Sequence, residues 1–466
     1  MVVMDIFFHN TLSGQKEKFE PIKVGSVLMY HCGPTLYDRQ HIGNLSMFIF
    51  TDILRKTLEY NSLEVRQVIN FTDFGHLSGD NEGDADRGED RMSKGLKREG
   101  MELSLTSMRK LAEKYAKYFL DDLKILNIKT ENTLFPYASD YIAEQIKMIE
   151  TLLEKEYAYV GKDGVYYDTS KFPDYGKLGN INLEGLKEGA RVAESDDKRN
   201  PTDFLLWKFD TALGWQSPWG LGFPGWHIEC SAMIIKLLGE QIDIHTGGIE
   251  HIAIHHNNEI AQAEVATGKK PFSKFWLHRA HLKIDDAKIS KSVGNVVYLD
   301  DLAKRNIHPM SLRYLLLSSH YQTPANFSWE GVLGAQNALE KILTNYLNLA
   351  DTNENDQEIL EKFEKAISDN LNTSTAIAIL HEAKSKSVIE KMDQILGLDI
   401  KNLSAKIMKI PEEILDMQKE RGAARVAKDW ATSDRLRTEI ESQGYTLEDK
   451  EGISTIKKTL VSLIST

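Results

Sequence analysis

The chain has 466 residues, of which 41% are hydrophobic, with 57 basic and 69 acidic side chains and a formal charge of −12. This apolar content excludes a disordered chain, the 31 glycines exclude a collagen-like repeat, and no run approaches the ~20 apolar residues of a membrane helix. The length allows about three folding units. The acidic balance argues against indiscriminate nucleic-acid binding but leaves open an RNA partner on a local basic surface.

The first residues and the cysteines indicate the compartment. The opening sequence MVVMDIFFHN carries an aspartate and no basic stretch, so we expect no signal peptide and a cytoplasmic protein. The two cysteines, Cys32 and Cys230, lie almost two hundred residues apart, which argues against a disulfide framework. We expect them to be metal ligands, a catalytic thiol or small buried side chains.

The first half of the chain predicts an α/β domain. Residues 26–31 are typical of a buried strand, and Cys32-Gly33-Pro34 should turn the chain. Apolar residues at helical spacing follow Gly43, and a second strand is expected at residues 65–70. A strand, a helix and a strand at this spacing form a βαβ unit, which predicts a parallel sheet. A further helix is expected at residues 101–126.

The amino-acid composition changes in the middle of the chain. Residues 159–225 are rich in glycine, proline and tryptophan, which is typical of an insertion rather than a helical layer. Helical periodicity returns at residues 232–238, and residues 241–245 should form a strand before Gly247-Gly248. From residue 338 onward the pattern is helical, with a last module that begins in a basic helix.

The sequence His41-Ile42-Gly43-Asn44 lies at the predicted turn between strand and helix. A glycine at a helix N-terminus lets a phosphate approach the backbone amides, and the helix dipole favours its charge. His41 and Asn44 can donate hydrogen bonds to that phosphate. Taken alone, four residues fit an ordinary helix cap better than a phosphate site.

A second motif, Lys288-Ile289-Ser290-Lys291-Ser292, places two lysines among small polar residues. Such a loop can clamp a triphosphate, although a solvated lysine loop is the better reading of the motif by itself. The two motifs occur in this order, about 250 residues apart, and bracket an α/β core. This pair is characteristic of class I aminoacyl-tRNA synthetases, which the chain resembles in this respect.

A third group of residues suggests a metal site. His255 and Glu259 are spaced i and i+4, so a helix would place them on one face. With Cys32 and Cys230 they form a plausible tetrahedral zinc set. The usual paired Cys-x-x-Cys spacing is missing, so buried thiols and a core histidine stay open as alternatives.

An acidic stretch invites comparison with a calcium loop. The sixth position of such a loop requires glycine, and Ala85 occupies it here, so we reject calcium. The acidic residues concerned are Asp80, Asp84, Asp86, Glu89 and Asp90.

Beyond the two signature motifs, the sequence resembles the cysteinyl-tRNA synthetases over essentially the whole chain. The segments that carry this resemblance are residues 30–38 (YHCGPTLYD), 201–208 (PTDFLLWK), 218–220 (PWG), 225–233 (GWHIECSAM), 255–262 (HHNNEIAQ), 369–373 (DNLNT) and 428–434 (KDWATSD). The resemblance implies an α/β fold: a class I Rossmann-type catalytic domain with an insertion, followed by a helical domain and a small C-terminal anticodon-binding module. The implied boundaries are residues 1–115 and 225–335 for the two catalytic halves, 116–224 for the insertion, 336–405 for the helical domain and 406–466 for the anticodon-binding module.

The resemblance also implies roles for individual residues. The implied zinc ligands are Cys32, Cys230, His255 and Glu259. The implied catalytic residues are His41, Asn44, Lys288 and Lys291, and the implied ATP contacts are His41, Gly43, Asn44, Gly247, Gly248 and Lys291. The positions that match the amino-acid pocket are Cys32, Thr35, Trp207 and His227. The basic positions 421–437 are expected on one helix with Trp430 available for stacking, and the expected tRNA contacts are Arg425, Lys428, Trp430 and Arg435.

The function implied is that of a cysteine–tRNA ligase. Such an enzyme activates L-cysteine with ATP to cysteinyl-adenylate and transfers the cysteinyl group to tRNA(Cys), with Mg²⁺ accompanying ATP. Zn²⁺ would select the thiolate of cysteine, because the hydroxyl of serine is harder and has a far higher pKa. A site of this kind can discriminate by ~10⁴ without editing. We expect a monomer that does not bind a membrane.

Three places depart from the family pattern, and two other functions stay open. Ile289 stands where methionine is usual, the segment after Asp73 differs, and Ile456 replaces a tryptophan. One rival is a cysteine ligase of mycothiol-type synthesis, which acylates an amino-sugar and lacks a complete anticodon module. The other is a non-catalytic tRNA-binding paralogue, which should have lost a phosphate-binding or zinc residue. This chain keeps the anticodon-module region as well as the phosphate-binding and zinc residues.

Overall fold

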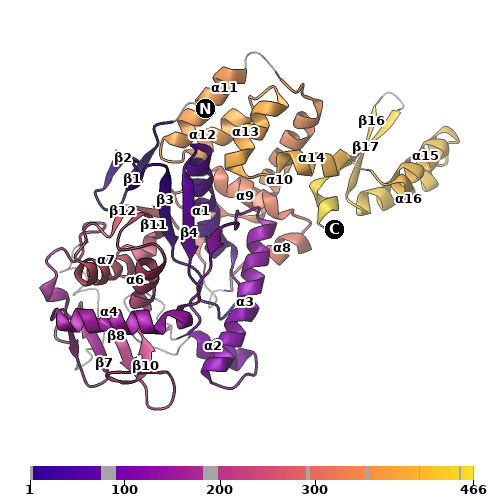
Figure 1. Ribbon diagram of the computed structural model, residues 1–466. Coiled ribbons are helices and arrows are strands. Elements are labelled where there is room, and N and C mark those ends of the chain that lie inside the picture. The colour runs from indigo at the N-terminus through magenta and orange to yellow at the C-terminus, as the bar shows by residue number, and fades with distance from the viewer. Residues whose placement is uncertain are drawn as a thin grey trace. The chain divides into compact units, whose positions relative to one another are not determined.

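The computed structural model describes residues 4–74, 91–181, 198–289, 294–352, 356–408, 410–450 and 453–464. The chain divides into two compact units (Figure 1). The first comprises Met1–Lys124, Lys129–His281 and Tyr321–Thr323, and the second comprises Ile125–Ile128, Leu282–His320 and Pro324–Thr466. Among the described helices, none has the length and apolar character needed to cross a membrane.

A five-stranded parallel sheet forms the centre of the first unit. Its strands, in spatial order, are β12 (Ser273–Arg279), β11 (Ile242–Gly248), β3 (Ser26–His31), β4 (Glu64–Ile69) and β5 (Thr133–Leu134). All residues of β11 are buried, as expected for a parallel strand covered on both faces. A short hairpin of β1 (Phe7–Asn10) and β2 (Gln15–Lys18) precedes this sheet.

The predicted βαβ unit is confirmed. Strand β3 has the predicted bounds, and α1 (Ile42–Tyr60) carries the chain to the parallel neighbour β4. The helix expected at residues 101–126 is α3 (Leu105–Ile125). A helix that the sequence did not indicate, α2 (Arg91–Arg98), precedes it. Gly95 allows α2 to approach the backbone of Tyr37 closely, because a Cβ at this position would lie 2.9 Å from the carbonyl oxygen of Tyr37.

The second sheet of this unit is antiparallel and falls within the segment whose texture predicts an insertion. Its strands, in spatial order, are β6 (Ala158–Val160), β7 (Gly164–Tyr167), β8 (Phe204–Phe209), β10 (Gly220–Pro224) and β9 (Trp215–Ser217). Gly222 is required here, since a Cβ would overlap the backbone carbonyl of Lys208. The domain boundaries implied by the resemblance stay predictions.

Three helices complete the first unit: α4 (Ile142–Glu154), α6 (Trp226–Leu237) and α7 (His255–Thr267). Helices α6 and α7 pack side by side (Figure 1). The prediction of a helix at residues 232–238 was too short, because α6 begins at Trp226. Its first turns contain buried polar side chains, which interrupt the apolar periodicity.

The second unit begins with a small sheet and continues as helices. The sheet contains β13 (Leu282–Ile284), β14 (Ala287–Lys288) and β15 (Ala325–Phe327). The helices are α8 (Leu299–Lys304), α9 (Pro309–Leu317), α10 (Trp329–Asn348), α11 (Asp356–Ser368), α12 (Thr373–Leu380), α13 (Lys386–Leu396) and α14 (Ile400–Met408). The expectation of helices from residue 338 is therefore confirmed.

The chain ends in two helices and a hairpin. These elements are α15 (Glu412–Val426), α16 (Trp430–Ser442), β16 (Tyr445–Lys450) and β17 (Ile453–Lys458). A small core of Ile414, Ile440, Tyr445 and Leu447 holds them together. Ile456, one of the positions expected to depart from the family pattern, packs against this core.

Candidate active site and metal centre

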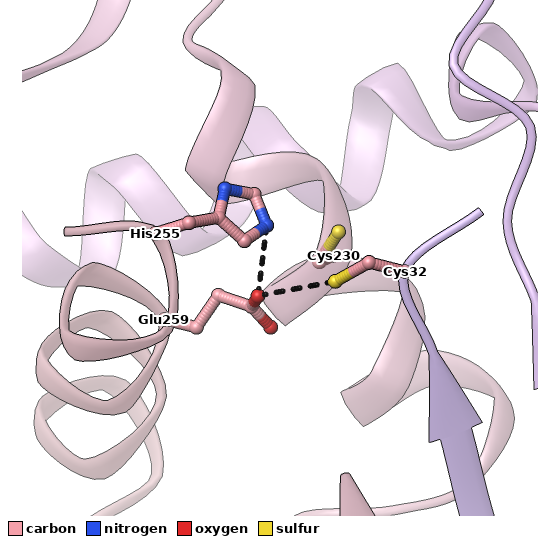
Figure 2. A group of neighbouring side chains, drawn as sticks. All are labelled: Cys32, Cys230, His255 and Glu259. Atoms are coloured by element: carbon pink, nitrogen blue, oxygen red, sulfur yellow. Dashed lines mark hydrogen bonds and ion pairs between the residues drawn. The ribbon is translucent and has the colours of Figure 1, made fainter. Parts of the chain in front are cut away.

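Four side chains from three separate segments converge in the first unit (Figure 2). Cys32 directly follows β3, Cys230 lies on α6, and His255 and Glu259 lie one turn apart on α7. Their ligand atoms all lie within 4.8 Å of one another. The Nε2 atom of His255 is 2.9 Å from Oε1 of Glu259, and the Cys32 sulfur is 3.7 Å from the same oxygen. The structure therefore brings together the set expected from residue type.

The backbone around Cys32 is held by side chains at the carboxyl ends of neighbouring strands. The Gly33 amide donates to Oδ1 of Asn70 at 2.7 Å. A Cβ at Gly33 would overlap the Asn70 carbonyl, so only glycine permits this approach. The turn predicted at Cys32-Gly33-Pro34 thus aims one thiol at α7.

The donor set fits a zinc ion. Two thiols, an imidazole and a carboxylate are ligands that zinc takes in proteins. The His255 Nε2 atom is buried and makes no aligned hydrogen bond among the described residues, although the Glu259 carboxylate lies beside it. The second oxygen of Glu259 is held by Nε2 of His245 at 2.8 Å, as is usual for partners that orient metal ligands.

Sequence reasoning did not single out His245 and His256. Their ring nitrogens form a second close group with Cys32 and Glu259. Nδ1 of His256 lies 2.7 Å from Nε2 of His278, and Nε2 of His256 lies 3.5 Å from the Cys32 sulfur. The sequence signals were a histidine within strand β11 and the doubled histidine at the start of α7.

The protons in the cluster are unevenly distributed. A hydrogen bond from Cys32 lowers the pKa of Cys230 to about 6, while burial raises the pKa of Cys32 well above its usual value. Burial lowers the pKa of His255, but Glu259 and Cys230 outweigh this effect and raise it to about 10. Glu259 keeps a low pKa despite its burial, because His245 and His255 stabilise the carboxylate. A metal ion would therefore displace a proton from His255.

The His41 motif begins α1, as predicted. His41 is the N-cap residue, and its Nδ1 accepts the backbone amide of Asn44 at 3.2 Å. Gly43 follows in the first turn, where the backbone amides of a helix have no partners within the helix. The motif thus provides the helix N-terminus on which the phosphate prediction depends.

The two glycines that were expected to contact ATP, Gly247 and Gly248, end strand β11. A Cβ at Gly247 would lie 2.6 Å from Cε1 of His256, and one at Gly248 would overlap the Glu250 carboxylate. Gly247 therefore excludes a larger side chain at the carboxyl end of the sheet, because His256 is buried, whereas the exposed Glu250 side chain beside Gly248 can move.

Of the positions that match the amino-acid pocket, His227 lies beside a candidate metal donor, since its Nδ1 is 2.8 Å from Nδ1 of His255. Thr35 forms an isolated parallel β-bridge with Thr72. Trp207 is fully buried in β8, where its ring packs against Trp219. The tryptophan beside the four donors is Trp226, whose ring centre lies 4.3 Å from that of His255. The segment GWHIECSAM contained this signal.

Known proteins are similar to this sequence over nearly its full length. Residues 18–337 match a family model described as the class I (C) tRNA synthetase catalytic domain. The cysteine–tRNA ligase 1 of Burkholderia lata is 42% identical over 460 residues, which cover 96% of this chain and 95% of that protein. The cysteine–tRNA ligase of Treponema denticola is 40% identical over 98% of this chain and 100% of that protein. The chain belongs to the cysteine–tRNA ligase family.

A solved structure supports the fold of this family. The Mycobacterium tuberculosis methionyl-tRNA synthetase in complex with methionyl-adenylate superposes with a TM-score of 0.56. The match covers 82% of this chain and 90% of that one at 12% identity. The protein therefore has the class I aminoacyl-tRNA synthetase fold that was expected.

The lysine motif of this cysteine–tRNA ligase family member lies in the second unit. Lys288 ends β14, which pairs with β13 across a turn at Asp285 and Asp286. Lys291 lies outside the described residues, as do the acidic positions Asp80, Asp84, Asp86, Glu89 and Asp90. The roles of both lysines stay predictions.

The prediction of one basic helix in the C-terminal module was wrong. Helix α15 ends at Val426, Lys428 adopts a φ of 60°, and Asp429 caps a new helix that begins with Trp430. Asp429 is a strong N-cap signal, and it could have shown the break. Arg425 pairs with Asp449, Arg435 pairs with Glu439 at 3.4 Å, and Trp430 is 59% exposed.

Proposed function

We propose that this protein is a cysteine–tRNA ligase that activates L-cysteine with ATP and transfers it to tRNA(Cys). The observation that carries the proposal is the convergence of Cys32, Cys230, His255 and Glu259 in a member of this family. We expect it to act in the cytoplasm as a monomer.

In the first step, a carboxylate oxygen of cysteine bonds to the α-phosphorus of ATP, and the bond to the bridging oxygen breaks to release pyrophosphate. The N-terminus of α1 and the side chains of His41 and Asn44 would stabilise charge on the α-phosphate. Lys288 and Lys291 would hold the leaving pyrophosphate, and Mg²⁺ accompanies the nucleotide. A hydroxyl of the terminal adenosine of tRNA then attacks the carbonyl carbon, and AMP leaves.

Cys32, Cys230, His255 and Glu259 would hold a zinc ion. When bound, zinc would supply a Lewis-acid position that favours the substrate's sulfur as a thiolate. His245 holds the second oxygen of Glu259 at 2.8 Å and so orients this ligand. Serine lacks the group that the site requires, so discrimination of ~10⁴ needs no editing step.

The test is the charging of a tRNA(Cys) transcript by the purified protein, with cysteine and serine measured in parallel. Charging with cysteine alone supports the proposal. Cysteine-dependent release of pyrophosphate without charged tRNA would contradict it and indicate another acceptor, such as an amino-sugar. An absence of pyrophosphate exchange would indicate a non-catalytic tRNA-binding protein.

A further inference from the structure

Glu229 is a buried carboxylic acid that belongs neither to the candidate metal donors nor to the predicted phosphate motifs. It directly precedes Cys230 on α6 and has no exposed surface. Its Oε2 accepts a hydrogen bond from Oγ1 of Thr72 at 3.0 Å. Its Oε1 is also buried and has no hydrogen-bond partner among the described residues. An unpartnered carboxylate oxygen in a protein interior is costly, so it requires an explanation.

A chain of hydrogen bonds connects Glu229 to the segment that carries the other thiol. The side-chain Nδ2 of Asn70 donates to Thr72 Oγ1 at 3.3 Å, and Oδ1 of Asn70 accepts the backbone amide of Gly33 at 2.7 Å. The backbone carbonyl of Thr72 also accepts the Leu36 amide at 3.0 Å. The Glu229 side chain therefore lies where α6, the end of β4 and the turn after Cys32 meet. The two thiol ligands come from two of these three segments.

No lysine or arginine of the described residues forms an ion pair with the Glu229 carboxyl group. The ionisable groups that act on it include Cys230, Asp73 and His255, and its hydrogen-bond donor is Thr72. One oxygen of this buried group therefore still needs a hydrogen-bond donor. A small cation that arrives with the substrate would supply this donor.

We propose that Glu229, held in place by Thr72, binds the α-ammonium group of the amino-acid substrate. The inference rests on the proposed function, because it places the substrate's sulfur at the Cys32 and Cys230 donors. In cysteine, the carbon that bears sulfur is bonded to the carbon that bears the amino group, so the ammonium group must lie close to the sulfur site. Glu229 directly precedes Cys230, one of the two thiol donors of that site.

The experiment compares two thiols on zinc-loaded protein by calorimetric titration. L-cysteine carries the ammonium group, whereas 3-mercaptopropionate has the same thiol and carboxylate without it. For Glu229→Gln we expect the affinity for L-cysteine to fall by about 10- to 100-fold, the usual value of a charge-assisted hydrogen bond. The affinity for 3-mercaptopropionate should stay within about twofold, because that ligand makes no such bond. The matched control is Glu144→Gln, which removes a carboxylate of α4 that pairs with Lys236 of α6 at 3.0 Å.

The outcomes separate this inference from the proposed function. Equal loss of affinity for both thiols would show that Glu229 only supports the fold, and unchanged affinity for both would also overturn the inference. If Glu229→Gln loses zinc or fails to fold, Thr72→Val is measured in the same way, and a loss confined to L-cysteine supports the inference while any other result overturns it. Wild-type protein that binds neither thiol and charges no tRNA would instead refute the proposed function.

Discussion

The Nδ1 atom of His41 accepts the backbone amide of Asn44 at 3.2 Å, so one side chain both caps α1 and belongs to the motif that we expect to bind phosphate. Because Nδ1 is an acceptor here, the neutral ring carries its proton on Nε2. The capping atom and the proton that can reach a phosphate are therefore on opposite sides of the ring. These two roles can be separated by substitution.

We predict that His41→Asn keeps the stability of the protein but lowers the rate of cysteine-dependent ATP–pyrophosphate exchange by about 10²-fold or more. Asparagine is a good N-cap residue but cannot reproduce the Nε2 proton. His41→Ala should lose the same activity and also about 1 kcal/mol of stability. The control is His308→Asn, since His308 caps α9 in the same way through Nδ1. Full exchange activity in His41→Asn would mean that His41 is only a cap.

Removal of one thiol should empty the metal centre. We predict that Cys230→Ser loses both bound zinc and cysteine activation, because a hydroxyl is a poor zinc ligand at neutral pH. Metal analysis after dialysis and pyrophosphate exchange measure the two effects. His381→Gln is the control, since this exposed histidine contacts Tyr314 in the second unit, and the variant should retain zinc. Retained zinc with full activity in Cys230→Ser would refute the metal role.

Much of this architecture could be predicted from sequence because its local patterns are regular. Strand β3 and the crossover helix α1 have the apolar periodicity that their burial requires. Helices α6 and α7 do not, since α7 buries polar residues on nearly every side. Periodicity rules assume one polar face, so they fail where the site itself forms the interior.

The candidate site was predicted in part for a similar reason. The four candidate metal donors have recognisable chemistry, and the i, i+4 spacing of His255 and Glu259 indicated one of the three segments that carry them. Glu229 and His256 have no spacing signal, because their partners Thr72 and His278 come from distant strands. Only tertiary structure could show these pairs.

The acid sensitivity of the second unit should depend on His308. Burial lowers the pKa of His308 to about 4, and Lys406 adds to this effect. The unfolded chain takes up this proton near pH 6.5, so the contribution of His308 to stability is complete above about pH 6.5 and is lost as the pH falls toward 4. His308→Asn should therefore show a smaller decrease in Tm between pH 7 and pH 5 than the wild type. An unchanged decrease would contradict this; His281→Asn, at an exposed position, is the control.

Arg55 on α1 should contribute strongly to the stability of the first unit. Its buried guanidinium donates to Thr133 at 2.6 Å, to the Glu131 carbonyl at 2.6 Å and to Glu59 at 2.9 Å. Arg55→Met leaves these acceptors without their donor, and we expect a loss of ~3 kcal/mol in denaturant unfolding. Arg66→Met, at an exposed position of β4, should cost little. Similar losses for both would show that the Arg55 network adds nothing beyond a surface charge.

Trp430 should matter for tRNA charging and not for stability. It is 59% exposed at the first position of α16, directly after the turn that contains Lys428. A base stacked on an aromatic ring is worth about 1–3 kcal/mol, so Trp430→Ala should lower kcat/KM for tRNA(Cys) by about 5- to 150-fold. Pyrophosphate exchange and Tm should stay unchanged, because no buried contact is lost.

The matched control is Val426→Ala, because Val426 is 87% exposed at the end of α15 but has no aromatic face. If both variants charge tRNA as well as the wild type, the turn between α15 and α16 does not contact the anticodon. If both lose charging equally, the surface acts through apolar contact rather than stacking. A loss confined to Trp430→Ala identifies the ring as a stacking platform, since both side chains are exposed and only Trp430 has an aromatic face.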